Sequence, residues 1–88
     1  MTRTIHTQMQ ENGLTPPIVI PPHEIRNVDF GEYENGLLLP ILELQQVSIP
    51  ASVSQSDSRL VNPDGTIHLI VHLQNFGSRS ETVQLREL

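Results

Sequence analysis

Apolar and polar residues alternate along much of the second half of the chain, which is the pattern of strands with one buried face. The longest example runs from Thr66 to Asn75. One face of this stretch is entirely apolar: Ile67, Leu69, Val71 and Leu73. The opposite face is mixed: His68, Ile70, His72 and Gln74. We therefore expect a strand over residues 66–75 that packs its apolar face on a core.

Two neighbouring strands follow from the same reasoning. Residues 81–88 predict a last strand with Val83 and Leu85 facing inward. Before residue 66, the Asn-Pro-Asp-Gly tetrapeptide at 62–65 predicts a tight turn, because proline presets its own φ and glycine accepts a positive φ. The turn joins a strand at residues 58–61 to the long strand as a hairpin.

A further strand is predicted upstream of this hairpin. Its inward residues alternate up to residue 53: Val47, Ile49, Ala51 and Val53. Pro50 has no N–H to donate to a neighbouring strand, which favours a position at a sheet edge. Leu42 and Leu44 have the opposite parity, so the change at Gln45-Gln46 indicates a bulge or a crossing between two sheets. No segment demands a helix, and the one weak candidate is a turn over residues 22–26.

The first 36 residues show no sustained period. The prolines of the segment 15–22 fix φ and exclude a helix, so we expect a stiff extended rod with Ile18 and Ile20 on one side and Val19 on the other. Asn35-Gly36 is a turn dipeptide. The sequence thus predicts an extended N-terminal arm over 1–36 and a β-sandwich-like domain over 37–88.

The predicted fold class is all-β, a small immunoglobulin-like β-sandwich or partial sandwich. Three or four strands from residues 37–88 leave an apolar face and open edges, and residues 37–42 are the most apolar run of the chain. Three kinds of cover remain open: the arm of the same chain, identical copies around a symmetry axis, or a larger scaffold. We expect a homo-oligomer, and by analogy a trimer more than a dimer.

The strand residues resemble the opening strands of the CARDB-like group of bacterial immunoglobulin-like β-sandwiches. Three stretches carry the resemblance: Val47-Ser48-Ile49-Pro50 through Val53, Thr66 to Gly77 with its Asn-Phe-Gly end, and Thr82-Val83-Gln84-Leu85. Together they span about half of what a complete sandwich needs. The resemblance implies a fold class and no ligand.

Charge and composition exclude several partners. The net charge is -5, with five arginines, no lysine and ten acidic residues, so there is no basic stripe for nucleic acid or an anionic membrane. Without cysteine, disulfides and thiolate metal sites are excluded. No apolar run is close to the length of a membrane span, which is about 18 residues. No signal-peptide pattern is present either, so we expect a cytoplasmic origin.

The candidate chemistry is sparse. His68 and His72 share a face but lie about 13 Å apart along a strand, too far to bind one zinc ion together. His6 and His23 have no spaced partner. The acidic residues around Phe30-Gly31 (Asp29, Glu32 and Glu34) match no calcium-loop spacing and predict a solvated loop. No nucleophile motif is present either, so we expect no catalytic, cofactor or metal site.

Size, absent chemistry and the proline-rich arm favour a structural assembly protein. By analogy, we expect a subunit like the cement or decoration proteins of tailed-phage capsids, located in the virion and made in the host cytoplasm. The expected partner-binding residues are Pro16, Pro17, Ile18, Val19, Ile20, Pro21, Pro22, Leu37, Leu39 and Ile41. The alternative is a binding module for a cell-surface glycan or protein, whose recognition loop is Asn75, Phe76, Gly77, Ser78 and Arg79.

Overall fold

The computed structural model describes residues 2–34, 41–46 and 52–88, and every regular element in these ranges is a strand. The strands in chain order are β1 (Thr2–His6), β2 (Ile18–Ile20), β3 (Ile25–Glu34), β4 (Leu42–Gln46), β5 (Val53–Val61), β6 (Thr66–Asn75) and β7 (Glu81–Glu87). The all-β fold class predicted from the sequence is therefore confirmed. The described residues include no helix long and apolar enough to cross a membrane.

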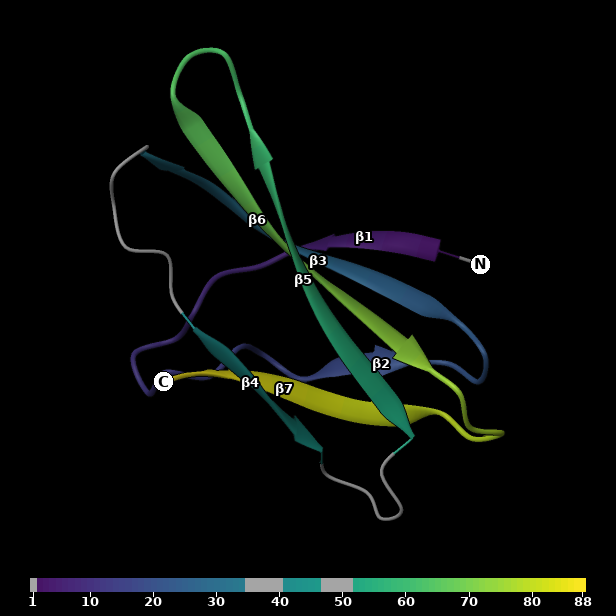
Figure 1. Cartoon of the computed structure of the whole chain (residues 1–88). Helices are drawn as coiled ribbons and strands as arrows, with labels where there is room; N and C mark the ends of the chain where they lie inside the picture. The colour runs from purple at the N-terminus through teal and green to yellow at the C-terminus, as the bar shows by residue number, and fades with distance from the viewer. Residues whose placement is uncertain (1, 35–40, 47–51) are drawn as a thin grey trace.

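The strands form two sheets packed face to face. One sheet has four strands in the order β1-β3-β6-β5, and the other has three in the order β2-β7-β4 (Figure 1). All pairs are antiparallel except β1 with β3, which is parallel. The Cα trace is thin, with a shortest extent of 16 Å against a longest of 41 Å. A sandwich of two layers accounts for this shape, since stacked sheets lie about 10 Å apart.

Every second residue of the central strands points into the space between the sheets. On β6 the inward residues Leu69, Val71 and Leu73 are buried, and on β7 Val83 and Leu85 are fully buried. The core contains residues from six strands: Ile18, Ile20, Val28, Phe30, Leu42, Val53, Leu69, Val71, Leu73, Val83 and Leu85. The inward faces predicted for these two strands are confirmed.

The predicted hairpin turn is present. The amide of Gly65 donates to the Asn62 carbonyl at 3.1 Å, and Gly65 has φ 90°. The strand before the turn is longer than residues 58–61, because β5 pairs with β6 from residue 53 onward. The expected alternation over 47–51, with Pro50 at an edge, lies outside the described residues. β4 and β5 belong to different sheets, so the parity change after Leu44 marks a crossing between sheets.

The prediction of a separate N-terminal arm over 1–36 is wrong. β2 pairs with β7 and β3 with β6, so the first 34 residues supply three strands of the same sandwich. Ile18 and Ile20 are buried between the sheets rather than available to a partner. The cover for the apolar face is thus the chain's own N-terminal segment, one of the three possibilities the sequence left open. The candidate turn over 22–26 ends at Ile25, where β3 begins.

Pairing between β3 and β6 contains one irregularity. The register shifts between Asp29 and Glu32, and Gly31 inside the shift has φ 86°. This is a β-bulge, in which one extra residue on a strand changes which side chains share a face. Its effect on β3 is to bring two carboxylates, those of Asp29 and Glu32, to the same side of the sheet.

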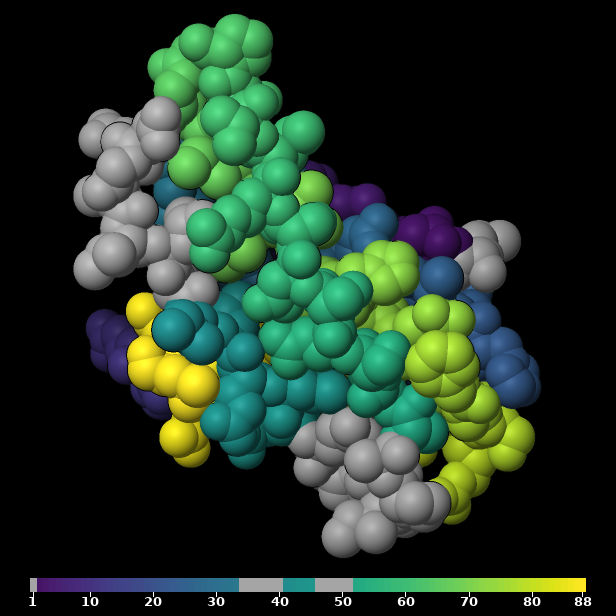
Figure 2. Space-filling view, in the orientation of Figure 1, coloured from purple at the N-terminus to yellow at the C-terminus, as the bar shows by residue number. Residues whose placement is uncertain are grey.

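The hairpin end of the larger sheet extends beyond the smaller one. Figure 1 shows the turn between β5 and β6 projecting away from β4, β7 and β2. Along β5 every residue after Gln55 is exposed, including Leu60 and Val61. The space-filling view shows β5 lying open along this face of the molecule (Figure 2).

Candidate functional site

The loop that joins β6 to β7 is held by the side chain of Asn75. This residue ends β6 and is fully buried. Its Nδ2 donates to the carbonyl oxygens of Ile20 at 2.9 Å, Pro21 at 3.3 Å and Arg79 at 2.8 Å. Its Oδ1 accepts from the amide of Gly77 at 2.8 Å. One amide group therefore ties together the end of β2, the start of the loop and the end of the loop.

Two further contacts complete this anchor. The hydroxyl of Ser52 donates to Asn75 Oδ1 at 3.0 Å, and the amide of Phe76 donates to the Ser52 carbonyl at 2.9 Å. A Cβ on Gly77 would lie 2.8 Å from Ser52 Oγ, closer than a Cβ approaches an atom to which it is not bonded. Gly77 thus permits the loop to pack against Ser52. Buried polar groups with such complete hydrogen bonding make a segment rigid.

The loop exposes side chains of the types that contribute most to binding at protein interfaces. Phe76 is 62% exposed, and Ser78, Arg79 and Ser80 are exposed as well. Aromatic and arginine side chains dominate the energy of protein interfaces. An exposed phenylalanine on an ordered loop is therefore an informative feature.

The fold brings the two segments predicted to bind partners to one end of the molecule. The loop 75–79 and the proline-flanked strand β2 meet through Asn75, as the hydrogen bonds to Ile20 and Pro21 show (Figure 1). On β2, Val19 faces outward and is 53% exposed. Pro16, Pro17 and Pro22 are also exposed. The sequence predicts a binding role for each segment and does not predict that the two lie together.

Several predicted binding residues have other roles. Ile18 and Ile20 belong to the core, because burial stabilises apolar side chains. Asn75 is a buried anchor rather than a recognition residue, and its hydrogen bonds offset the cost of burying its amide. Ile41 is exposed but begins the segment leading into β4. Leu37 and Leu39 lie outside the described residues. The predicted binding residues of these two segments that remain exposed are Pro16, Pro17, Val19, Pro22, Phe76, Ser78 and Arg79. We call the exposed residues next to the Asn75 anchor, Pro22, Phe76, Ser78 and Arg79, the Phe76 surface.

A second polar cluster lies on the outer face of the four-stranded sheet. His68 on β6 sits between two carboxylates of β3, with Nδ1 3.3 Å from Asp29 Oδ1 and Nε2 3.1 Å from Glu32 Oε1. His6 on β1 approaches the same Asp29, at 3.7 Å. Without the bulge at Gly31, Asp29 and Glu32 would point to opposite faces, since residues an odd number apart on a strand do.

The cluster favours the charged form of both central groups. The hydrogen bond to Glu32, followed by that to Asp29, raises the pKa of His68. Burial alone would raise the pKa of Asp29, but the Gly31 amide at 2.8 Å and His68 outweigh it and lower that pKa. A doubly protonated imidazole donates to both carboxylates at once. The charged form of His68 on β6 therefore makes two hydrogen bonds to β3.

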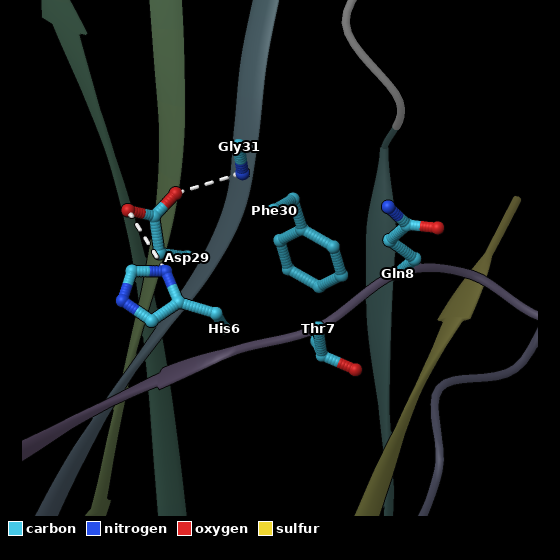
Figure 3. A pocket seen from close by; sticks show the side chains of 6 residues that line it. All are labelled: His6, Thr7, Gln8, Asp29, Phe30 and Gly31. Carbon is cyan, nitrogen blue, oxygen red and sulfur yellow. Dashed lines mark hydrogen bonds and ion pairs between the residues drawn. The ribbon is translucent and has the colours of Figure 1, made fainter.

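An open hollow of about 380 Å³ lies beside this cluster. Figure 3 shows His6 and Asp29 side by side, with the Phe30 ring between them and Gln8 in this view. The hollow offers one carboxylate, one imidazole and an aromatic ring, and its carboxylate is already bonded to Gly31 and His68. Among the described residues, no group of three or more histidine and acidic side chains is placed to hold a metal ion.

The sequence pattern does not reveal this cluster. It predicts a solvated loop for Asp29 and Glu32 and a separate strand for His68, because the pairing of β3 with β6 joins positions 36 or more residues apart. The available signal was Gly31 within an otherwise strand-like stretch, which is typical of a bulge.

Comparisons with known proteins give no relative to guide the assignment. No protein-family model, no curated protein and no solved structure matches the chain.

Proposed function

We propose that this chain is a non-catalytic structural module that attaches to a larger protein assembly through the Phe76 surface. The single observation that carries the proposal is the buried Asn75 anchor, which holds an exposed phenylalanine and arginine in a fixed loop. A loop ordered before binding loses little conformational entropy on docking, which raises affinity without further contacts.

The attachment we propose is of the decoration type, as in the cement proteins of phage capsids, with a virion location. Its support is the ordered loop and the scarcity of reactive groups around the hollow. The docking surface differs from the one expected from the sequence, because the interior of the sandwich already holds Ile18 and Ile20. A glycan-binding module using the same loop is the competing function.

Site-specific photocrosslinking tests the proposal. A photoreactive residue replaces Phe76 in one variant and the exposed Glu11 in a matched control, and both are irradiated in cells that produce the protein. We expect one protein, repeated in many copies of an assembly, to crosslink through position 76 and not through position 11. Equal labelling from both positions, or recovery of glycan instead of protein, would contradict the proposal.

A binding measurement follows once that partner is identified. Phe76→Ala and Arg79→Ala should each weaken attachment by about tenfold or more, as hot-spot residues do. The control is Arg3→Ala on β1, which carries the same change of charge as Arg79→Ala and should leave attachment unchanged.

A further inference from the structure

β5 forms an open edge of the four-stranded sheet. It pairs with β6 over all nine of its residues without a register shift, and no described strand lies on its other side. Proteins usually protect such an edge with charged side chains, above all lysine, with proline or with a bulge. Residues 53–61 contain no lysine, proline or bulge, and their two charges, Asp57 and Arg59, have opposite signs. A long and regular edge, with no described strand beyond it, is a template for another strand.

The hydrogen-bond pattern shows which backbone groups are available. The Asn62 amide donates to Thr66, so even-numbered residues of β5 bond to β6. The Asn75 amide donates to Glu24, which confirms that the odd-numbered residues of β6 bond on the other side, toward β3. Because bonding alternates along antiparallel strands, the amides and carbonyls of Gln55, Asp57 and Arg59 point away from β6.

The two charged side chains at the middle of this edge are exposed. Within the described part of the chain, Arg59 has no hydrogen bond or ion pair, and Asp57 accepts only from Gln55 Nε2 at 3.1 Å. The charges are opposite and two residues apart on the same face of the strand. They are therefore complementary to an antiparallel copy of themselves.

We propose that two copies of the chain pair through β5, antiparallel about a two-fold axis at Ser58. In this register Asp57 of each copy lies opposite Arg59 of the other, and Gln55 lies opposite Val61. All of these positions are odd-numbered, so their outward backbone groups meet and extend the two four-stranded sheets into one. The occupant of the β5 edge is a second copy of this chain.

Charge selects this register among the neighbouring ones. Moving the axis to Asp57 places that carboxylate opposite its own copy, and moving it to Arg59 does the same for the guanidinium. Like charges directly opposite on a sheet are destabilising, whereas opposite charges stabilise. The register centred on Ser58 avoids both clashes and forms two ion pairs. The resulting two-fold dimer differs from the trimer expected by analogy.

Charge reversal tests the pairing through the mass of the protein in solution. Sedimentation of the full chain over a concentration series should show a monomer–dimer equilibrium. Arg59→Asp places Asp opposite Asp at both pairs, and Asp57→Arg places Arg opposite Arg. Each should weaken dimerisation by about tenfold or more. The double variant, Asp57→Arg with Arg59→Asp, restores opposite charges and should recover the dimer.

The control reverses a charge on the far edge of the same sheet. Arg3→Asp on β1 makes the same change in net charge as Arg59→Asp and should leave dimerisation unchanged. Circular dichroism of every variant checks that the sandwich is intact. A monomer at all concentrations, a trimer, or a dimer equally affected by the double variant and the single variants would overturn the proposal. This mass measurement is independent of crosslinking at Phe76, so either proposal can fail alone.

Discussion

Asn75 shows how one side chain can organise a surface. Its amide satisfies the carbonyls of Ile20, Pro21 and Arg79 from inside the protein, where water cannot replace the lost bonds. The exposed Phe76 follows it directly in the sequence. The order of the Phe76 surface therefore depends on a neighbour that is itself fully buried.

Replacing Asn75 with Ala should destabilise the fold strongly. Three carbonyls and the Gly77 amide would lose their partner, and we expect the free energy of unfolding to fall by about 3 kcal/mol. Urea denaturation measures the change. The control is Asn12→Ala, which removes an exposed bond to the Leu14 amide and should cost less than about 0.5 kcal/mol. Similar losses at both positions would show that the anchor is unimportant.

His68 should make stability depend on pH. Its folded pKa is raised above the ordinary 6.5, so its contribution is fully present below that value and is lost as the pH rises through the folded pKa. The pKa of Asp29 is lowered from 3.8, so its contribution is present above 3.8 and is lost as the pH falls through the folded pKa. The cluster therefore stabilises most between these two values.

The measurement is the urea midpoint between about pH 5 and 8, the range in which histidine titrates. We expect His68→Gln to flatten the decline of stability with rising pH. His72→Gln is the matched control, since His72 bonds the neutral amide oxygen of Asn27. A decline that persists unchanged in His68→Gln would refute the role of His68.

At the scale of elements, the bulge in β3 decides which side chains meet. Gly31 has φ 86°, a conformation that disfavours any residue with a Cβ, although there is free space around it. The bulge turns Glu32 toward His68 and leaves Asp29 on the same face. A local backbone feature thus builds a contact between two strands.

Gly31→Ala should act on both stability and the cluster. Backbone strain should lower the free energy of unfolding by about 1 kcal/mol, and displacement of Glu32 should lower the pKa of His68, followed by NMR titration. Gly13→Ala provides the control, because Gly13 has φ 78° with equally open surroundings. It should cost a similar stability and leave the His68 titration unchanged. If the pKa of His68 were unaltered in Gly31→Ala, the bulge would not be what holds Glu32 against His68.

At the scale of the whole molecule, the strands of the N-terminal third contribute unequally to the core. β1 leaves all its residues exposed except Ile5, which is partly buried. β2 and the residues before it are different, because Thr15, Ile18 and Ile20 are buried against β7 and the core. The sandwich can therefore spare its first strand more readily than its second.

Two truncations test this difference. Removing residues 1–6 should leave a cooperative thermal transition, because little apolar surface becomes exposed. Removing residues 1–20 uncovers Val83 and Leu85 and should abolish cooperative unfolding. Circular dichroism with heating distinguishes the outcomes. A well-folded protein after the longer deletion would restore the idea of a separate arm.

Much of the second half was predictable from the sequence, because alternation and turn chemistry are local. The strand 66–75, its buried face and the turn at 62–65 follow from period two and from the Asn-Pro-Asp-Gly order. The alternation of β3 was harder to detect, since Arg26 occupies an inward, buried position and Gly31 interrupts the period.

Tertiary structure decided the partners of each segment. Three contacts join positions that are far apart in the chain. β2 pairs with β7, His68 lies between Asp29 and Glu32, and Asn75 bonds Ile20. The pattern of apolar residues states which side of a strand is buried and not what buries it. Several pairings satisfy the same alternation, and the packing of the core selects among them.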